Sequence, residues 1–247
     1  MRALLTLFMI VSSAAAIAAN EIDTKVATAL AAESRPAADV LRDRNRRPLE
    51  TLNFFGLKDN MRVLELIPGG GWYTRVLAPV LAENGQFLVA VRATGIEESL
   101  LTEPGFENVT VLDTSANMRR PQGSRFYTLD EFEIGVADLD MALTFRNLHN
   151  FDRTSRDKLN SAVFDALKPG GLYGVIDHTK RHMEPAGSEN RRRHDPVQII
   201  LEMLDHGFEF IAYSDLHYRA DDELEYEVGR RAVAGNTDRF TLLFRKP

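Results

Sequence analysis

The stretch Arg-Val-Leu-Glu-Leu-Ile-Pro-Gly-Gly-Gly-Trp-Tyr-Thr, residues 62–74, decides the fold of this chain. Residues 63–67 are apolar except for one glutamate, which is typical of a strand that is covered on both faces of a sheet. Gly69, Gly70 and Gly71 then present no side chains that would keep a ligand from the backbone N–H groups opening the next helix. The stretch therefore predicts a strand, a turn and a helix that border a ligand pocket.

Length and composition indicate one α/β domain with a small or neutral partner. The chain has 247 residues, of which 44% are apolar, and this is enough for one substantial core. Its 30 basic and 36 acidic side chains give a net charge of −6, so no general positive field attracts nucleic acid. The 247 residues include no cysteine, which excludes disulfides, thiol nucleophiles and cysteine metal sites within this sequence. We expect a small-molecule partner and no nucleic acid.

The first residues have the pattern of a secretory signal peptide. Arg2 supplies the positive charge, residues 3–11 the apolar core, and Ala-Ile-Ala at 16–18 a cleavage site of small residues. We therefore expect residues 1–19 to be removed and the protein to be exported, to the periplasm if the source is a Gram-negative bacterium, without stable membrane insertion. A retained anchor is the alternative. It needs about 20 uninterrupted apolar residues, and the serines at 12–13 weaken the run.

Apolar runs alternate with helical patterns along the rest of the chain, which predicts parallel strands joined by crossover helices. No helical pattern separates the last two runs, so they should pair antiparallel. We predict an α/β fold in residues 51–247: a doubly wound, mostly parallel seven-stranded sheet with an antiparallel final strand. A helical cap at residues 20–50 should precede it. The expected strands are residues 62–67, 86–91, 109–112, 140–145, 172–176, 208–216 and 239–244.

Three segments resemble motifs of the class I S-adenosylmethionine-dependent methyltransferases. Residues 63–71 are similar to the first motif of that superfamily, whose glycine loop surrounds the methionine part of the cofactor. Residues 143–151 are similar to the fourth-strand motif, which borders the methyl group, and residues 167–172 to the turn before strand five. The likeness extends in order over residues 51–247. The signal peptide and the runs Pro-Gly-Gly-Gly-Trp-Tyr and Phe-Arg-Asn-Leu-His-Asn-Phe also resemble a group of exported predicted methyltransferases.

This resemblance implies a Rossmann-like methyltransferase fold, S-adenosylmethionine as the cofactor, and methyl transfer to an unidentified small-molecule acceptor. The residues expected to hold the cofactor are Glu65, Gly69, Gly70, Gly71, Asp113 and Asn147. Several of these residues also have a role that needs no ligand. The glycines of residues 69–71 can serve only a tight connection, Glu65 can bond N–H groups of the loop, and Asp113 can form a turn.

Two positions depart from the superfamily pattern. Ile67 occupies the place of the first glycine, and residues 89–92, at the end of the second strand, include no carboxylate to bond the ribose hydroxyls. Loss of such an acceptor costs about 1.5–3 kcal/mol, or about tenfold to a hundredfold in affinity, unless Glu97 or Glu98 reaches back to the site.

Two histidines are candidates for proton transfer. His149 follows the fourth strand and His178 ends the fifth, so both should lie at the sheet edge that carries the glycine turn. A neutral histidine there can take a proton from the methyl acceptor, and we assign this role to His149, with His178 as the second choice. The alternative role of His149 is structural: its ring can fasten the loop to a backbone carbonyl without any part in proton transfer. Asp177 and His178 are adjacent and point to opposite faces, so one at most should face the pocket.

The remaining patterns are weaker. The basic run at residues 191–194 can hold an anionic substrate or be a solvated loop, and Asp195 followed by proline is typical of a helix N-cap. The histidines and acids of residues 177–194 lack the spacing of a metal site, so we predict none. Thr74 replaces the last glycine of a dinucleotide motif, and no Gly-x-Ser-x-Gly element indicates a hydrolase.

A second function stays open: a non-catalytic exported protein that binds a ligand or a partner on a methyltransferase scaffold. The two departures and the export signal motivate it, because one fold hosts many functions. In the enzyme, the charged stretch at residues 217–236 would cover the substrate.

Overall fold

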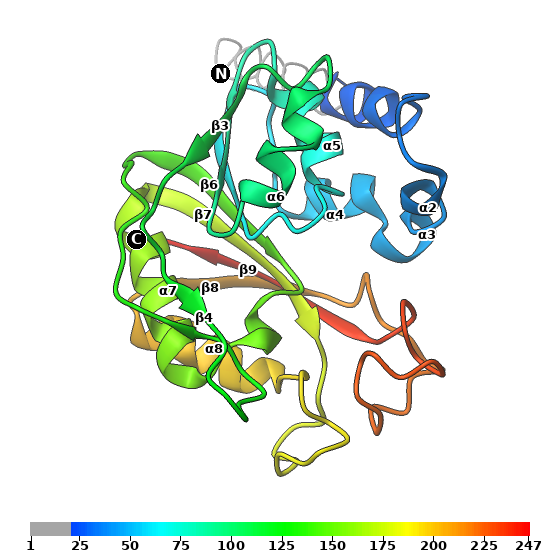
Figure 1. Ribbon diagram of the computed structural model, residues 1–247, viewed down its shortest axis with the longest axis vertical. Coiled ribbons are helices and arrows are strands. Elements are labelled where there is room, and N and C mark those ends of the chain that lie inside the picture. The colour runs from blue at the N-terminus through cyan, green and yellow to red at the C-terminus, as the bar shows by residue number, and fades with distance from the viewer. Residues whose placement is uncertain (1–20) are drawn as a thin grey trace, which may run out of the picture.

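A computed structural model describes residues 21–247, and the predicted signal peptide lies outside the described residues. The chain forms a seven-stranded sheet in the order β3-β2-β1-β6-β7-β9-β8 (Figure 1). Neighbouring strands are parallel from β3 to β7, whereas β9 is antiparallel to both β7 and β8. The predicted fold class is therefore confirmed. The strands of this sheet are β1 (Arg62–Leu66), β2 (Gln86–Ala90), β3 (Val109–Leu112), β6 (Leu139–Phe145), β7 (Leu167–His178), β8 (Glu209–Ser214) and β9 (Arg239–Arg245).

Helices cover both faces of the sheet (Figure 1). One face carries α4 (Pro48–Phe54), α5 (Thr74–Leu81) and α6 (Thr94–Glu97), and the other carries α7 (Arg153–Ala166) and α8 (Pro196–Asp205). No helix within residues 21–247 has the length and apolar character that a membrane crossing requires. Residues 21–30 are also helical, and the shorter helices are α2 (Ala37–Val40), α3 (Asp43–Arg46), η1 (Leu100–Thr102) and η2 (Leu148–Asn150).

Alternate residues of the central strands enter two separate hydrophobic cores, one on each face. In β1, Val63 packs in the core that includes α5, while Leu64 and Leu66 pack in the core that includes α7 and α8. All three side chains are completely buried. The continuous apolar run in the sequence is the direct result of this double coverage, because a strand with helices on both faces has no solvent side.

Two details differ from the sequence-based expectation. Residues 168–171, expected as a turn before the fifth strand, are part of β7. Gly170 N donates to Lys246 O at 2.8 Å and Lys246 N donates to Gly171 O at 2.9 Å, so the C-terminal residues hold this segment in the sheet. A hairpin of β4 (Met118–Arg119) and β5 (Thr128–Leu129) was not expected, because strands of two residues carry no hydrophobic period.

The N-terminal helices pack on the face that carries α5. Val26, in the first helical segment, is completely buried in the same core. The helical region is interrupted around Arg35 and Pro36, and α2 begins directly after Pro36. The Arg35 guanidinium bonds both carboxylate oxygens of Asp43, at 2.8 and 2.6 Å, and so fixes α3. This packing brings Arg46, the last residue of α3, to the edge of the sheet where β1 and β6 end.

Candidate functional site

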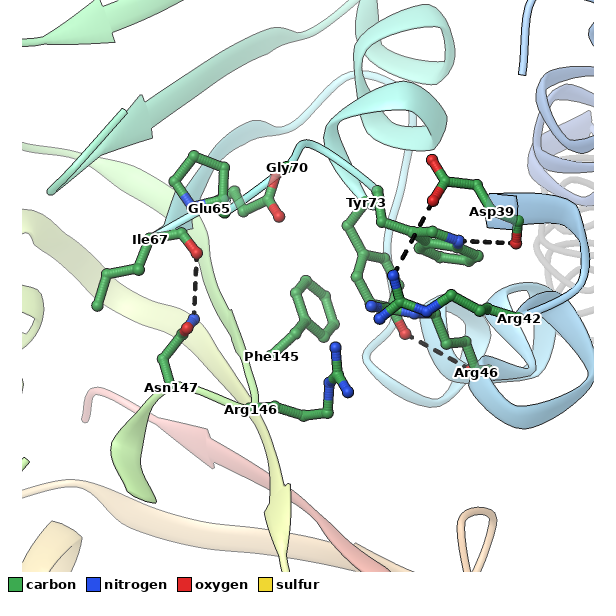
Figure 2. Close-up of a pocket in the computed structure, with 13 residues that line it drawn as sticks. Asp39, Arg42, Arg46, Glu65, Ile67, Gly70, Tyr73, Phe145, Arg146 and Asn147 are labelled. Atoms are coloured by element: carbon green, nitrogen blue, oxygen red, sulfur yellow. Dashed lines mark hydrogen bonds and ion pairs between the residues drawn. The ribbon is translucent and has the colours of Figure 1, made fainter. Parts of the chain in front are cut away.

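A hollow of about 310 Å³ lies at the glycine turn (Figure 2). The end of β1 and the turn after it form one side, the end of β6 forms another, and α2 and α3 close a third. Ligands of open α/β sheets bind at this place, outside the carboxyl ends of the strands. Small-molecule sites measure roughly 300–1,000 Å³, so the hollow is at the lower end of that range. Four of the predicted cofactor-binding residues line it: Glu65, Gly69, Gly70 and Asn147.

The three glycines of the turn have different surroundings. Gly69 and Gly70 are exposed, and a Cβ on either would meet no atom within 4 Å. Gly71 is buried with φ +77°, and a Cβ there would lie 2.4 Å from Cδ2 of Leu100. Gly69 and Gly70 therefore border the hollow, whereas Gly71 allows the turn to pack against η1.

Aromatic rings form the wall opposite the glycines. The rings of Tyr73 and Phe145 are stacked, with centroids 3.5 Å apart and planes at 10°. Trp72 meets Tyr73 edge-on at 4.7 Å, and its indole N–H donates to Asp39 O at 3.0 Å. Because Trp72 and Tyr73 are also buried in the core, the helix start and the pocket wall are fixed together.

Glu65 is a buried carboxyl group at the base of the hollow. Its Oε2 accepts a hydrogen bond from the Thr74 hydroxyl at 2.7 Å. Burial raises the pKa of Glu65 to about 8, although this hydrogen bond and the charge of Arg46 act in the opposite direction. The side chain is therefore mostly protonated at neutral pH and brings little negative charge to the site.

Asn147 is held by the ends of two strands. Its side-chain NH₂ donates to Leu66 O at 3.1 Å and to Ile67 O at 3.3 Å. Figure 2 shows the second of these contacts. Ile67, the residue in place of the first motif glycine, has φ +53°, in the left-handed region that favours glycine. The amide of Asn147 thus occupies the carbonyls at the end of β1 and fixes a strained turn.

Asp113, the remaining predicted cofactor residue, lies in a second hollow of about 640 Å³ between the ends of β2 and β3. Its carboxylate accepts from the backbone N–H of Ser115 at 3.1 Å, which is the turn contact that the sequence left open. Glu97 of α6 lines the same hollow, but Glu98 does not. The two hollows have no lining residue in common, and both lie at the same edge of the sheet.

His149 and His178 meet at the ends of β6 and β7, with ring centroids 4.8 Å apart. The carboxylate of Asp177 lies 2.6 Å from Nδ1 of His149 and also accepts from the backbone N–H groups of His149 (3.0 Å) and His178 (2.7 Å). Nε2 of His149 lies 3.1 Å from an Nη of Arg192. A carboxylate only accepts and a guanidinium only donates, so Nδ1 carries the proton and Nε2 is the acceptor.

The charge state of this group follows from its burial. Burial alone would raise the pKa of Asp177, but the hydrogen bond from His149 holds it well below its usual range. Burial lowers the pKa of His178 well below its usual value, so that histidine is neutral. An ionised aspartate thus supports two imidazoles at the rim of a hollow of about 190 Å³, which both histidines line.

Among residues 21–247, His149, Asp177 and His178 form the one group whose ligand atoms lie close enough to hold a metal ion, within 4.8 Å of one another. Sequence spacing did not indicate this group, because His149 comes from a different strand end. The Arg192 guanidinium on Nε2 of His149 opposes a cation there, since like charges repel.

The basic run at residues 191–194 is dispersed rather than clustered. Arg191 is exposed, Arg192 reaches His149 and Glu227, and Arg193 forms a buried ion pair with Asp222. Asp195 accepts from Val197 N at 2.9 Å and caps α8, as its sequence context predicts.

Sequence reasoning missed two features of the site. The Asp177–His149 contact joins the ends of different strands, so the alternation argument, which compared only chain neighbours, did not find it. The guanidiniums of Arg46 and Arg146 also face the glycine-turn hollow (Figure 2). Arg146 lies inside the quoted fourth-strand motif, and its position directly after that strand was the available signal.

Solved structures with this architecture include S-adenosylmethionine-dependent methyltransferases. One from Aquifex aeolicus is similar with a TM-score of 0.56 and 17% identity, over 83% of this chain and 98% of that one. The [4+2]-cyclase SpnF is similar with a TM-score of 0.55 and 17% identity, over 92% of this chain and 93% of that one. Human N-acetylserotonin methyltransferase, solved with S-adenosylmethionine, is similar with a TM-score of 0.53 and 13% identity, over 85% of this chain and 54% of that one. No protein-family model and no curated protein matches the chain. The likeness shows the fold, which is the Rossmann-like fold of these methyltransferases.

Alanine substitutions of the glycine turn should separate packing from ligand access. Gly71→Ala places a methyl group against Leu100 at positive φ, so we expect a loss of about 1–3 kcal/mol in the free energy of unfolding, measured in urea. Gly70→Ala is the matched control and should change that free energy by less than about 0.5 kcal/mol. Equal losses in both variants would contradict the separate roles.

Glu65→Gln should change how stability depends on pH. The folded state binds the Glu65 proton more tightly than the unfolded state, because its pKa is raised from 4.5 to about 8. The wild type should therefore lose stability relative to the variant as pH rises through this window, by on the order of 5 kcal/mol in total. All other titrating groups are common to both proteins, so the difference between their urea midpoints isolates Glu65. Parallel pH curves would show that Glu65 ionises normally.

The protonation state of His149 can be observed directly. Long-range ¹H–¹⁵N spectra should show a neutral ring with the proton on Nδ1. In Asp177→Asn one acceptor oxygen becomes an NH₂ group that faces an N–H donor, so this tautomer preference should weaken and unfolding should become easier by about 1–3 kcal/mol. A wild-type ring protonated on Nε2 would refute the assignment.

Proposed function

We propose that this chain is an exported enzyme that transfers a methyl group from S-adenosylmethionine to a small-molecule acceptor. The observation that carries the proposal is the adjacency of two hollows, one at the glycine turn and one at His149, both lined by Arg146. A site that positions the donor and a group that accepts a proton are what this transfer requires of a protein. The fold shared with methyltransferases supports the same reaction class.

The residues at the sheet edge fit the cofactor in two places. At the glycine turn, Gly69 and Gly70 leave the backbone open toward the hollow. Between β2 and β3, Glu97 supplies the carboxylate that the end of β2 lacks, and Asp113 lies in the same hollow. Gly69 and Gly70 would hold the amino-acid end, and Glu97 and Asp113 the nucleoside end. When bound, the cofactor supplies a methyl group on a positively charged sulfur.

His149 is the residue that we assign to proton transfer. Asp177 holds its Nδ1–H and thereby keeps Nε2 available as an acceptor toward the hollow. Arg192 donates to that Nε2, so its side chain must move before His149 can accept a proton from a bound acceptor. Apart from that contact, Arg192 is held by one ion pair, with Glu227 at 3.2 Å, in which the Arg192 side chain is 39% exposed. Val228 and Gly229, from the stretch proposed to cover the substrate, border the same hollow.

A non-catalytic binding protein is the second candidate, and two contacts favour it. Asn147 already occupies the carbonyls of Leu66 and Ile67, and Arg192 already occupies Nε2 of His149. In that case the hollows would bind a ligand without reaction.

Calorimetry with S-adenosylhomocysteine tests the proposal. We expect binding by the wild type, binding weakened about tenfold to a hundredfold in Glu97→Gln through loss of a charged acceptor, and unchanged binding in Glu98→Gln. The two glutamates are neighbours on the chain and both are exposed, so the second variant controls for the charge change. No heat from the wild type at high micromolar concentration would reject methyl transfer and leave the binding protein.

A further inference from the structure

The buried arginines of this chain form two groups. Three of them pair closely with a carboxylate, as buried charges normally must. The other two, Arg46 and Arg239, and the half-buried Arg146 beside them form no ion pair with any acidic residue within residues 21–247. The paired arginines are Arg35 with Asp43, Arg156 with Glu202 and Arg193 with Asp222.

The unpaired arginines are also poor in hydrogen bonds. The Arg46 guanidinium lies over the ring of Trp72, with 4.4 Å between its carbon and the ring centroid, and within the described chain neither it nor that of Arg146 donates a hydrogen bond. Arg239 donates only to two backbone carbonyls, at 3.1 and 3.2 Å. Nε of each of the three is buried without a partner. Arg46 and Arg239 are 7% and 5% exposed, so water does not replace the missing acceptors.

The three arginines converge on one place. They border a single narrow space together with Tyr73 and Phe145, and Figure 2 shows Arg146 pointing toward Arg46. Burial and repulsion from Arg146 together lower the pKa of Arg46 and of Arg239 to about 9. All three remain charged at neutral pH, while the nearby Glu65 is mostly protonated. Within residues 21–247 the space is therefore strongly positive, and the charge of Asp177 offsets that of Arg146 only in part, without an ion pair.

The cluster begins at the glycine-turn hollow, which Arg46 and Arg146 line with Gly69 and Gly70, and extends away from it to Arg239. Arg239 begins β9, which is three strands from β1 in the sheet, or about 14 Å at a strand spacing of about 4.8 Å. Arg146 lines both the glycine-turn hollow and the hollow of His149. The cluster thus extends from the donor site toward the proton acceptor, which is where an acceptor molecule has to lie.

We infer that the acceptor is an anion and that Arg46 and Arg146, which line the glycine-turn hollow, bind its carboxylate or phosphate group, while Arg239 behind them adds positive charge. Guanidinium groups match both oxyanions through paired N–H donors, and the anion supplies the charge that the chain withholds. This inference rests on the proposed function, because it names the class of the acceptor. The anion site itself requires no methyl transfer.

Thermal unfolding of the purified protein with inorganic phosphate or succinate tests the inference, with and without saturating S-adenosylhomocysteine. The variants are Arg146→Gln and, as a matched control, Arg44→Gln, which removes an exposed charge from the same segment as Arg46. An anion that binds only the folded state raises the melting temperature with its concentration. We expect at least one of the two anions to bind at millimolar concentration, at least about tenfold more weakly in Arg146→Gln and equally well in Arg44→Gln.

Two further readouts decide which molecule supplies the bound anion and whether Arg146 binds that anion or only stabilises the fold. Binding that persists under saturating S-adenosylhomocysteine supports an acceptor site, whereas complete competition assigns the arginines to the carboxylate of the cofactor and overturns the inference. Without anion, Arg146→Gln should melt at the same temperature as the wild type or higher, because it removes a repelled charge. A lower melting temperature would mean a structural role, and equal anion binding by the wild type and Arg146→Gln would also overturn the inference. If S-adenosylhomocysteine fails to bind, only the proposed function fails, because the anion titrations stand alone.

Discussion

The side-chain amide of Asn147 joins the ends of β1 and β6, and the shape of the site depends on this contact. Its NH₂ group donates to the last carbonyls of β1 while its own backbone follows β6. Ile67 and Arg146, on either side, both have left-handed backbones, with φ of +53° and +62°, and each costs about 1–3 kcal/mol. The amide offsets part of that strain. The segments that follow β1 and β6 therefore both turn sharply out of the sheet. This leaves Gly70 open toward the hollow and places the Arg146 guanidinium over it.

At this edge of the sheet, Arg46, Arg146 and Arg239 are charged, but the acidic side chains near them within residues 21–247 do not pair with them. Asp177 is ionised because three N–H groups point at it, and it serves only the histidines beside it. Glu65, one of the acids nearest to the arginines, is buried without such donors and holds its proton. The arginines therefore keep uncompensated charge in a region that excludes water, which lowers the stability of the unliganded protein. Such a cost is typical of a binding site that a ligand completes.

The sequence predicted the sheet well because helices cover both of its faces. Five apolar runs became parallel strands, and the missing crossover helix correctly indicated the antiparallel pair of β8 and β9. His149 and His178 were placed at one edge for a sound reason, since parallel strands end at the same side. The partner of His149 was missed because Asp177 was compared only with its chain neighbour. Arg46 was missed because its position depends on how α3 packs, which no local pattern encodes.

We propose that the edge formed by the ends of β1, β6 and β7 is one continuous binding site that an anionic guest completes. A crystal structure of the protein grown with S-adenosylhomocysteine and inorganic phosphate tests this most directly. We expect the amino-acid end of the nucleoside against Gly69 and Gly70, and a separate oxyanion between the guanidiniums of Arg46 and Arg146. Hollows closed by the protein's own side chains, or arginines that reach carboxylates of the chain instead, would contradict it.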